Sequence, residues 1–188
     1  MATSASGTAP RKPTRSELLA AAGLTIADVS APGLSVLFAG INPGLYSAAT
    51  GYHFARPGNR FWPALHMSGF TPYLLRPDEQ RQLLGFGLGI TNLVDRATAR
   101  ADELSPLELA DGASALAEKA AALRPRWLAV VGVTAYRTGF RNPRATIGRQ
   151  ELKIGATAVW VLPNPSGLNA HWNLRSLAEQ FARLRAVA

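Results

Sequence analysis

Two short segments of the chain combine an Asn-Pro pair with glycine and an apolar residue. They are Gly40-Ile41-Asn42-Pro43-Gly44-Leu45 and Asn164-Pro165-Ser166-Gly167-Leu168. An Asn side chain offers one carbonyl acceptor and two N–H donors, so it can orient a water molecule or bind a polar ligand. Asn42 cannot act as a general base, because an amide is not protonated near neutral pH. The first segment therefore predicts chemistry by positioning and hydrogen bonding.

Each segment directly follows a short apolar run that is typical of a buried strand, at residues 34–39 and 158–162. The Pro after each Asn biases that Asn toward an extended backbone, so its amide projects from a fixed position. Loops at the carboxyl ends of parallel strands build the sites of open α/β sheets. We therefore expect the two loops to converge on one pocket, although they lie far apart in the sequence.

Apolar runs alternate with helical patterns along the chain, which favours βαβ units and a mainly parallel sheet. Four strands are predicted, at residues 36–39, 89–93, 127–131 and 158–162. Helices are predicted at residues 14–22, 60–68, 77–84, 105–123, 134–140 and 172–185. Ser105, Pro106 and Glu108 supply an N-cap, a Pro at the first helical position and an acid at the third. Residues 1–13 are predicted to be a disordered basic leader, and residues 14–188 a single domain.

The composition is that of a globular protein without disulfides. Apolar residues make up 47% of the chain, and no apolar run is long enough to span a bilayer. The absence of Cys excludes disulfides, thiol catalysis and a cysteine-ligated iron–sulfur cluster. No cluster of His, Asp or Glu has metal-ligand spacing, so neither a metal nor another cofactor is expected. We expect a soluble protein of a reducing cytoplasm, associated with the nucleoid if the source is bacterial.

The formal net charge of the chain is +8. Lys and Arg gain affinity for nucleic acid by neutralising phosphates and releasing counterions. A GC-rich genome also produces an Arg-rich and Ala-rich composition, so the charge alone leaves both interpretations open. The placement of Arg137, Arg141, Arg144 and Arg149 in one stretch with Gly and Pro favours DNA binding, because a solvated helix face does not explain it. Arg141 and Arg144 are the expected DNA contacts.

The two segments, together with Phe54 and Asn59-Arg60-Phe61-Trp62, resemble motifs of the mismatch-specific uracil/thymine DNA glycosylases. These enzymes belong to the uracil-DNA glycosylase superfamily, and the resemblance runs from Leu34 to Arg175. It implies a three-layer α/β/α fold around a mainly parallel, four-stranded sheet. The segment from Asn59 to Trp62 is expected to anchor the helix that follows rather than to perform chemistry.

The resemblance implies a monofunctional glycosylase that flips uracil, and also ethenocytosine or thymine, out of G-mismatched duplex DNA. The enzyme would hydrolyse the N-glycosidic bond and leave an abasic site in base excision repair. Neither segment contains Lys, so a Schiff-base lyase activity is not expected. The expected partner is double-stranded DNA with a mismatched or damaged pyrimidine, with single-stranded DNA as a further substrate. The protein is expected to be a monomer without a membrane partner.

By this resemblance, the first segment forms the base pocket. Asn42 positions the attacking water, unless it only holds its own turn through an Asx hydrogen bond. Backbone N–H groups from Ile41 to Leu45 bond the base carbonyl or its developing anion, and Ser47 adds a polar contact. Phe54 stacks on the flipped base, unless it is a core aromatic.

The second segment resembles the loop with which superfamily members enter the minor groove and fill the vacated stack. Leu168 is the apolar wedge, and Asn164 closes the pocket. More active uracil enzymes have a His there that stabilises the leaving uracil anion, so weaker stabilisation is implied. Close relatives place Ser-Arg after the wedge, so either Asn169 or His171 is expected to read the opposite guanine. The expected DNA contacts of this loop are Ser166, Gly167, Leu168, Asn169 and His171.

Asp95 follows the predicted strand at 89–93, so it is expected near the same edge of the sheet. A carboxylate there can activate water as the general base that Asn42 lacks. It can equally pair with Arg96 or cap the loop before Glu103, and both interpretations stay open.

Three other functions also fit the sequence. One is a uracil glycosylase that acts on single strands without mismatch preference. Another is a DNA-binding protein that recognises lesions without cleaving, because a fold does not fix a function. The third is a hydrolase of small nucleotides, which would need neither the Arg cluster nor Leu168.

Overall fold

The computed structural model describes residues 11–188 and contains a five-stranded sheet in the order β2-β1-β3-β5-β4. The parallel strands are β1 (Val36–Gly40), β2 (Leu88–Asn92), β3 (Trp127–Val131) and β5 (Thr157–Leu162). They confirm the four predicted strands. The sheet nevertheless has five strands rather than four, because β4 (Gly148–Ile154) pairs antiparallel with β5 at one edge. This edge strand is mostly polar, so it lacks the apolar run that marks the buried strands.

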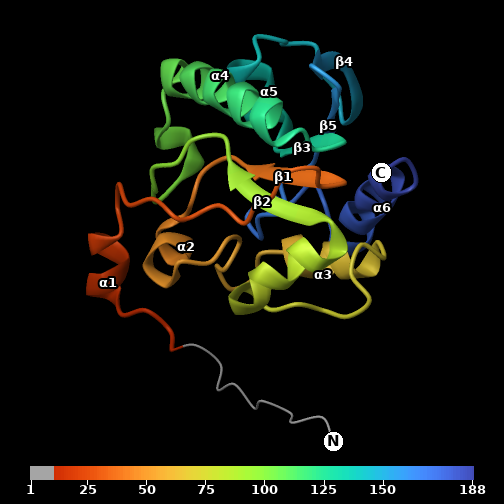
Figure 1. The fold of residues 1–188 in the computed structure, drawn as a ribbon. Coiled ribbons are helices and arrows are strands. Elements are labelled where there is room, and N and C mark those ends of the chain that lie inside the picture. The colour runs from red at the N-terminus through yellow and green to blue at the C-terminus, as the bar shows by residue number, and fades with distance from the viewer. Residues whose placement is uncertain (1–10) are drawn as a thin grey trace, which may run out of the picture.

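Helices cover both faces of the sheet, which confirms the three-layer α/β/α fold (Figure 1). One face is covered by α3 (Phe61–Met67) and α6 (Leu174–Arg185). The opposite face is covered by α4 (Pro106–Leu123) and α5 (Val133–Gly139). Successive side chains of a strand point to opposite faces. Phe38 of β1 therefore lies in the first core, and its neighbour Leu37 lies in the second.

Side-chain caps begin three of the predicted helices, and Asn173 supplies the cap of α6. Ser105 accepts a hydrogen bond from the N–H of Glu108, and the Glu108 carboxylate accepts one from the N–H of Ser105. This reciprocal capping box begins α4 where it was expected. Thr14 and Glu17 begin α1 (Arg15–Ala20) in the same way.

Three short elements differ from the sequence-based expectation. The segment predicted as a helix at 77–84 is a 3₁₀ helix, η1 (Pro77–Phe86). The prediction lacks α2 (Leu45–Thr50) and the 3₁₀ helix η2 (Ala101–Glu103). Both are too short for a helical period to be visible in the sequence.

Within the described part of the chain, no helix is long and apolar enough to cross a membrane. Residues 1–10 of the predicted leader lie outside the described residues. Arg11, in the rest of that leader, forms an ion pair of 2.5 Å with Glu17 of α1.

Candidate active site

A cavity of about 390 Å³ opens at the carboxyl ends of the parallel strands. It receives residues from the ends of β2 and β3 and from the loops after β1 and β5. The two Asn-Pro segments therefore meet at one cavity, as predicted from the strand that precedes each. Nine predicted site residues line it: Ile41, Asn42, Gly44, Ser47, Phe54, Asn164, Ser166, Leu168 and Asn169.

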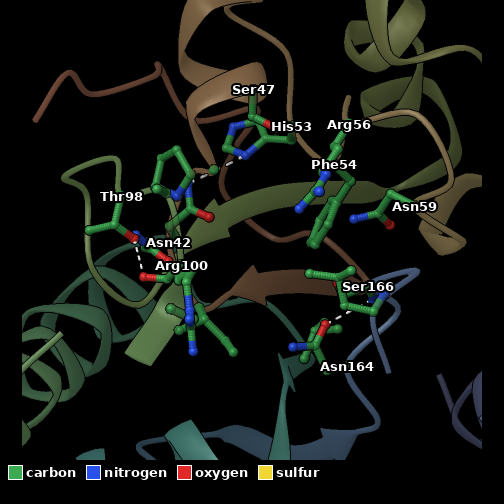
Figure 2. Close-up of a pocket in the computed structure, with 18 of the residues that line it drawn as sticks. Asn42, Ser47, His53, Phe54, Arg56, Asn59, Thr98, Arg100, Asn164 and Ser166 are labelled. Carbon is green, nitrogen blue, oxygen red and sulfur yellow. Dashed lines mark hydrogen bonds between the residues drawn. The ribbon is translucent and has the colours of Figure 1, made fainter. Parts of the chain in front are cut away.

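Asn42 is held by the loop that follows β2. Its Nδ2 donates hydrogen bonds to the carbonyl oxygen of Arg96 at 3.0 Å and to the hydroxyl of Thr98 at 2.7 Å. Figure 2 shows Asn42 beside Thr98. The Thr98 hydroxyl donates its own hydrogen to the carbonyl of Arg100 at 2.7 Å, so it accepts from Asn42. Both N–H groups of Asn42 are thereby used, and Oδ1 is the group left for a ligand. The Asn42 side chain therefore links the loop after β1 to the loop after β2, and it does not form the Asx hydrogen bond expected within its own turn.

The side-chain amide of Asn164 is bound through its oxygen, whereas that of Asn42 is bound through its nitrogen. Oδ1 of Asn164 accepts the backbone N–H of Ser166 at 2.9 Å, so the amide nitrogen is the group left for a ligand (Figure 2). Its carbonyl oxygen accepts a hydrogen bond from Nδ2 of Asn169 at 3.0 Å. The cavity therefore combines an amide oxygen from the loop after β1 with an amide nitrogen from the loop after β5.

Phe54 is part core residue and part cavity wall. One ring face stacks on Phe61 of α3, with ring centroids 4.0 Å apart and planes 14° apart. The ring also lines the cavity, where it is available to a planar ligand. Its backbone φ of 53° lies in the left-handed region, which is strained for an aromatic residue. The core interpretation of Phe54 therefore describes one side of the ring, while its stacking on a flipped base stays a prediction.

Two glycines of the first segment leave space for different reasons. A Cβ at Gly40 would lie 2.8 Å from Oδ1 of Asn92 and 3.1 Å from Cζ of Phe54. Gly40 is therefore required for these two side chains to reach the cavity. A Cβ at Gly44 would meet nothing within 4 Å, and Gly44 lines the cavity. Its φ of −75° is open to any residue, so neither the backbone conformation nor the local packing requires a glycine at this position.

His53 and Asn92 form a buried polar wall, and the sequence-based prediction assigned neither of them a role. His53 is 1% exposed, and its Nε2 donates to the carbonyl of Ala27 at 3.1 Å. Burial lowers the pKa of His53, so the ring is neutral at neutral pH and its Nδ1 is an acceptor. Nδ2 of Asn92 lies 3.5 Å from that Nδ1. The position of Asn92 at the end of a predicted strand was the available signal.

The backbone around Phe54 is fixed by side chains from three elements. The N–H of His53 donates to Gln80 at 2.8 Å, and its carbonyl accepts from the indole of Trp62 at 3.1 Å. The N–H of Ala55 donates to the hydroxyl oxygen of Ser47 at 3.2 Å. Strained backbone persists where its surroundings determine it in this way. Ser47 therefore shapes the pocket in addition to lining it.

The loop after β5 presents Leu168 to solvent, with 74% of the residue exposed. The N–H of Leu168 donates to the hydroxyl oxygen of Ser166 at 3.3 Å. Oδ1 of Asn169 accepts the N–H of His171 at 3.3 Å, so both ends of the Asn169 amide are used inside the loop. Nδ2 keeps a second N–H and Oδ1 a second lone pair, so the guanine-reading role of Asn169 stays a prediction.

The rim of the cavity carries polar residues that were not predicted. Arg56, Asn59 and Arg100 line it (Figure 2). Asp102 is the one carboxylate among the cavity-lining residues of the described chain. Its two oxygens accept hydrogen bonds from the guanidinium of Arg100, and the bond to Asp102 raises the pKa of Arg100.

The structure does not bring Asp95 to the cavity. β2 ends at Asn92, the next residues turn back to bond the carbonyls of Gly40 and Ile41, and the Asp95 side chain is exposed. Arg96, its expected alternative partner, pairs instead with Glu108 at 2.5 Å. This position disfavours Asp95 as the general base.

Four more predicted DNA contacts also lie outside the cavity lining: Gly167, His171, Arg141 and Arg144. His171 is exposed on the loop after β5, while Gly167 lies against the backbone of Gly58. Arg141 and Arg144 are exposed in the connection between α5 and β4. Because β4 begins opposite Val161, near the carboxyl end of β5, this connection returns to the sheet edge that holds the cavity.

A family model described as "Uracil DNA glycosylase superfamily" matches residues 27–186 of the chain. The matched region includes the five-stranded sheet and every cavity-lining residue except Ile26.

Proposed function

Because the chain belongs to the uracil DNA glycosylase superfamily, we propose that it is a monofunctional glycosylase that removes uracil from a G·U mismatch in duplex DNA. Family membership indicates a hydrolase of N-glycosyl bonds that acts on DNA in base excision repair. The mismatch preference, and ethenocytosine or thymine as further substrates, rest on the resemblance of the two Asn-Pro segments. The observation that carries the proposal is the opposite orientation of Asn42 and Asn164 in one cavity.

In this proposal, Asn42 holds the attacking water. Its free Oδ1 accepts a hydrogen bond from the water, whose oxygen is then directed at C1′ of the sugar. The C1′–N bond breaks as the C1′–O bond forms, the electron pair leaves with the base, and the water loses its proton to solvent. An amide cannot take that proton, so the enzyme forgoes part of the roughly 10²- to 10⁴-fold that a general base contributes.

Asn164 and Phe54 hold the departing base. The amide nitrogen of Asn164 donates to a base oxygen as negative charge develops there, and preorganised donors of this kind stabilise transition states. The free face of Phe54 stacks on the flipped base, which contributes about 1–3 kcal/mol. The absence of a Cβ at Gly44 lets the base approach the backbone closely.

Neither carboxylate near the site is placed to act as a general base, which supports catalysis by positioning. Asp102 is engaged by Arg100 at the rim, and Asp95 is exposed outside the cavity. A site without a free carboxylate depends on orientation and electrostatics, so we propose slow turnover. Leu168 inserts into the stack from which the base departs, and this insertion favours duplex substrates.

The test is alkali-induced strand cleavage of labelled duplexes with U·G, U·A or no lesion, and of single-stranded uracil DNA. Wild type is compared with Asn42→Ala and with Asp95→Ala as the matched control. We expect cleavage of U·G above U·A, its near-complete loss in Asn42→Ala, and wild-type behaviour of Asp95→Ala. Equal cleavage of U·G, U·A and single strands would contradict the mismatch preference and indicate a general uracil glycosylase. DNA binding without release of uracil from any substrate would contradict glycosylase activity and indicate a lesion-recognition protein.

A further inference from the structure

The guanidinium of Arg60 binds four backbone carbonyls of the loop that carries Leu168. Nε donates to the carbonyl of Pro165 at 3.3 Å, and one terminal nitrogen donates to that of Asn169 at 2.9 Å. The same nitrogen also donates to the carbonyl of Ser166, and the other terminal nitrogen to that of Trp172. The backbone N–H of Arg60 donates to Pro165 as well, at 3.0 Å.

These carbonyls converge on one point from both ends of the loop. Converging carbonyl dipoles repel one another unless a group with several donors lies between them. Arg supplies five N–H donors in a planar fork, whereas Lys supplies three from a single nitrogen. Arg60 has no ion-pair partner among the described residues, so carbonyls are its main partners. The side chain is therefore built into the loop and is not a surface charge.

A second contact seats the loop on the same segment. A Cβ at Gly167 would lie 2.7 Å from the carbonyl oxygen of Gly58, so the two backbones touch where no side chain fits. Gly167 and Ser166 are thus held against residues 58–60 from two directions. Leu168 is the next residue and projects into solvent.

We propose that Arg60 is the positioning residue that holds the loop of residues 164–172 in its DNA-inserting conformation before DNA arrives. The entropy of ordering the loop is then lost during folding rather than on binding, which favours insertion of Leu168 into a duplex. Single-stranded DNA offers no stack to fill, so its excision depends less on this order. The inference rests on the proposed function for its catalytic consequence, while the order of the loop can be measured without any activity.

The test compares Arg60→Lys, which keeps the charge, with Arg183→Lys on the exposed face of α6 as the matched control. Hydrogen exchange is measured on backbone amides of residues 164–172 and of residues 36–45. Uracil excision is measured on U·G duplex and on single-stranded DNA. We expect Arg60→Lys to speed exchange in 164–172 alone and to lower duplex excision about tenfold more than single-strand excision. Arg183→Lys should change neither.

A second variant, Gly167→Ala, displaces the loop from its other support and leaves Arg60 intact. It should reproduce the duplex-selective loss, because the added Cβ meets the carbonyl of Gly58. Unchanged exchange in 164–172 for Arg60→Lys, or equal losses on duplex and single strands for both variants, would overturn the inference. If wild type releases no uracil from any substrate, the proposed function fails, while the exchange comparison still decides whether Arg60 orders the loop.

Discussion

Asn42 and Asn164 leave opposite ends of their side-chain amides available in the same cavity. The nitrogen of Asn42 is bound by Arg96 and Thr98, and the oxygen of Asn164 is bound by the N–H of Ser166. An acceptor on one side and a donor on the other match the needs of hydrolysis, because the water requires an acceptor and the departing base requires a donor. The carbonyl of Arg96 can only accept and the N–H of Ser166 can only donate, so each fixes the orientation of the amide that it binds.

Asn164→Asp should lower uracil excision more than Asn164→Ala does. Both variants lose the donor to the base, and removal of one such donor typically costs about 10²- to 10³-fold in kcat. The Asp variant keeps an acceptor for Ser166 but adds a negative charge beside the developing anion. Single-turnover rates on a U·G duplex measure both. The reverse order would show that Asn164 does not face the leaving base.

Leu168→Ala should reduce excision from duplex DNA while leaving single-strand excision close to wild type. The side chain is exposed and lacks a core role, so the free energy of unfolding should stay within about 0.5 kcal/mol of wild type. Parallel single-turnover assays on duplex and single strands, together with thermal unfolding, separate the two effects. Equal loss on both substrates would contradict the wedge role.

Gly40→Ala and Gly44→Ala should impair the enzyme in different ways. The Cβ at Gly40 overlaps Asn92 and Phe54, and overpacking of this kind costs about 1–3 kcal/mol of stability. The Cβ at Gly44 enters open cavity, so Gly44→Ala should unfold near the wild-type temperature yet lose excision. Thermal unfolding and U·G excision are measured on both. Full activity of Gly44→Ala would show that the base does not approach that backbone.

Wild type should lose stability as the pH falls below the ordinary His pKa of 6.5, and His53→Gln should lose less. Burial lowers the pKa of folded His53, so the unfolded chain binds a proton first. Stability from the neutral ring is thus present above pH 6.5 and declines toward the lowered folded value. Thermal unfolding of both proteins from about pH 7.5 to about pH 5.5 measures the difference. An equal loss of stability in wild type and His53→Gln as the pH falls would show that other groups cause the acid sensitivity.

Changing Arg141 and Arg144 together to Gln should weaken binding to all duplexes and flatten the salt dependence of the affinity. Each phosphate contact that is lost reduces the number of released counterions and the slope by about one. Fluorescence anisotropy with duplexes of matched length, with and without a lesion, gives both quantities. The control is Arg81→Gln on η1, an exposed residue outside the proposed surface. An unchanged slope would place the DNA path elsewhere.

Much of the fold follows from local sequence. The apolar runs of β1, β2, β3 and β5 and the capping box of Ser105 are readable from neighbouring residues. The edge strand β4 was not predicted, because its pairing with β5 is a long-range contact and its side chains are largely exposed. Asp95 follows the end of β2, as expected, but its side chain is exposed and does not line the cavity. The end of β2 could be located from the sequence, but not the direction in which the following turn points a side chain.

The sequence by itself determined that the two Asn-Pro loops meet at one cavity, since both follow buried parallel strands. Only the tertiary structure decided what the residues of the cavity offer a ligand. The Oδ1 of Asn42 is free because Thr98 and Arg96 take its nitrogen, and His53 is neutral because the fold buries it. Arg60 binds the Leu168 loop, with its carbonyl partners in residues 165–172. Residue type fixes the number of donors and acceptors, but their partners come from segments that only folding brings together.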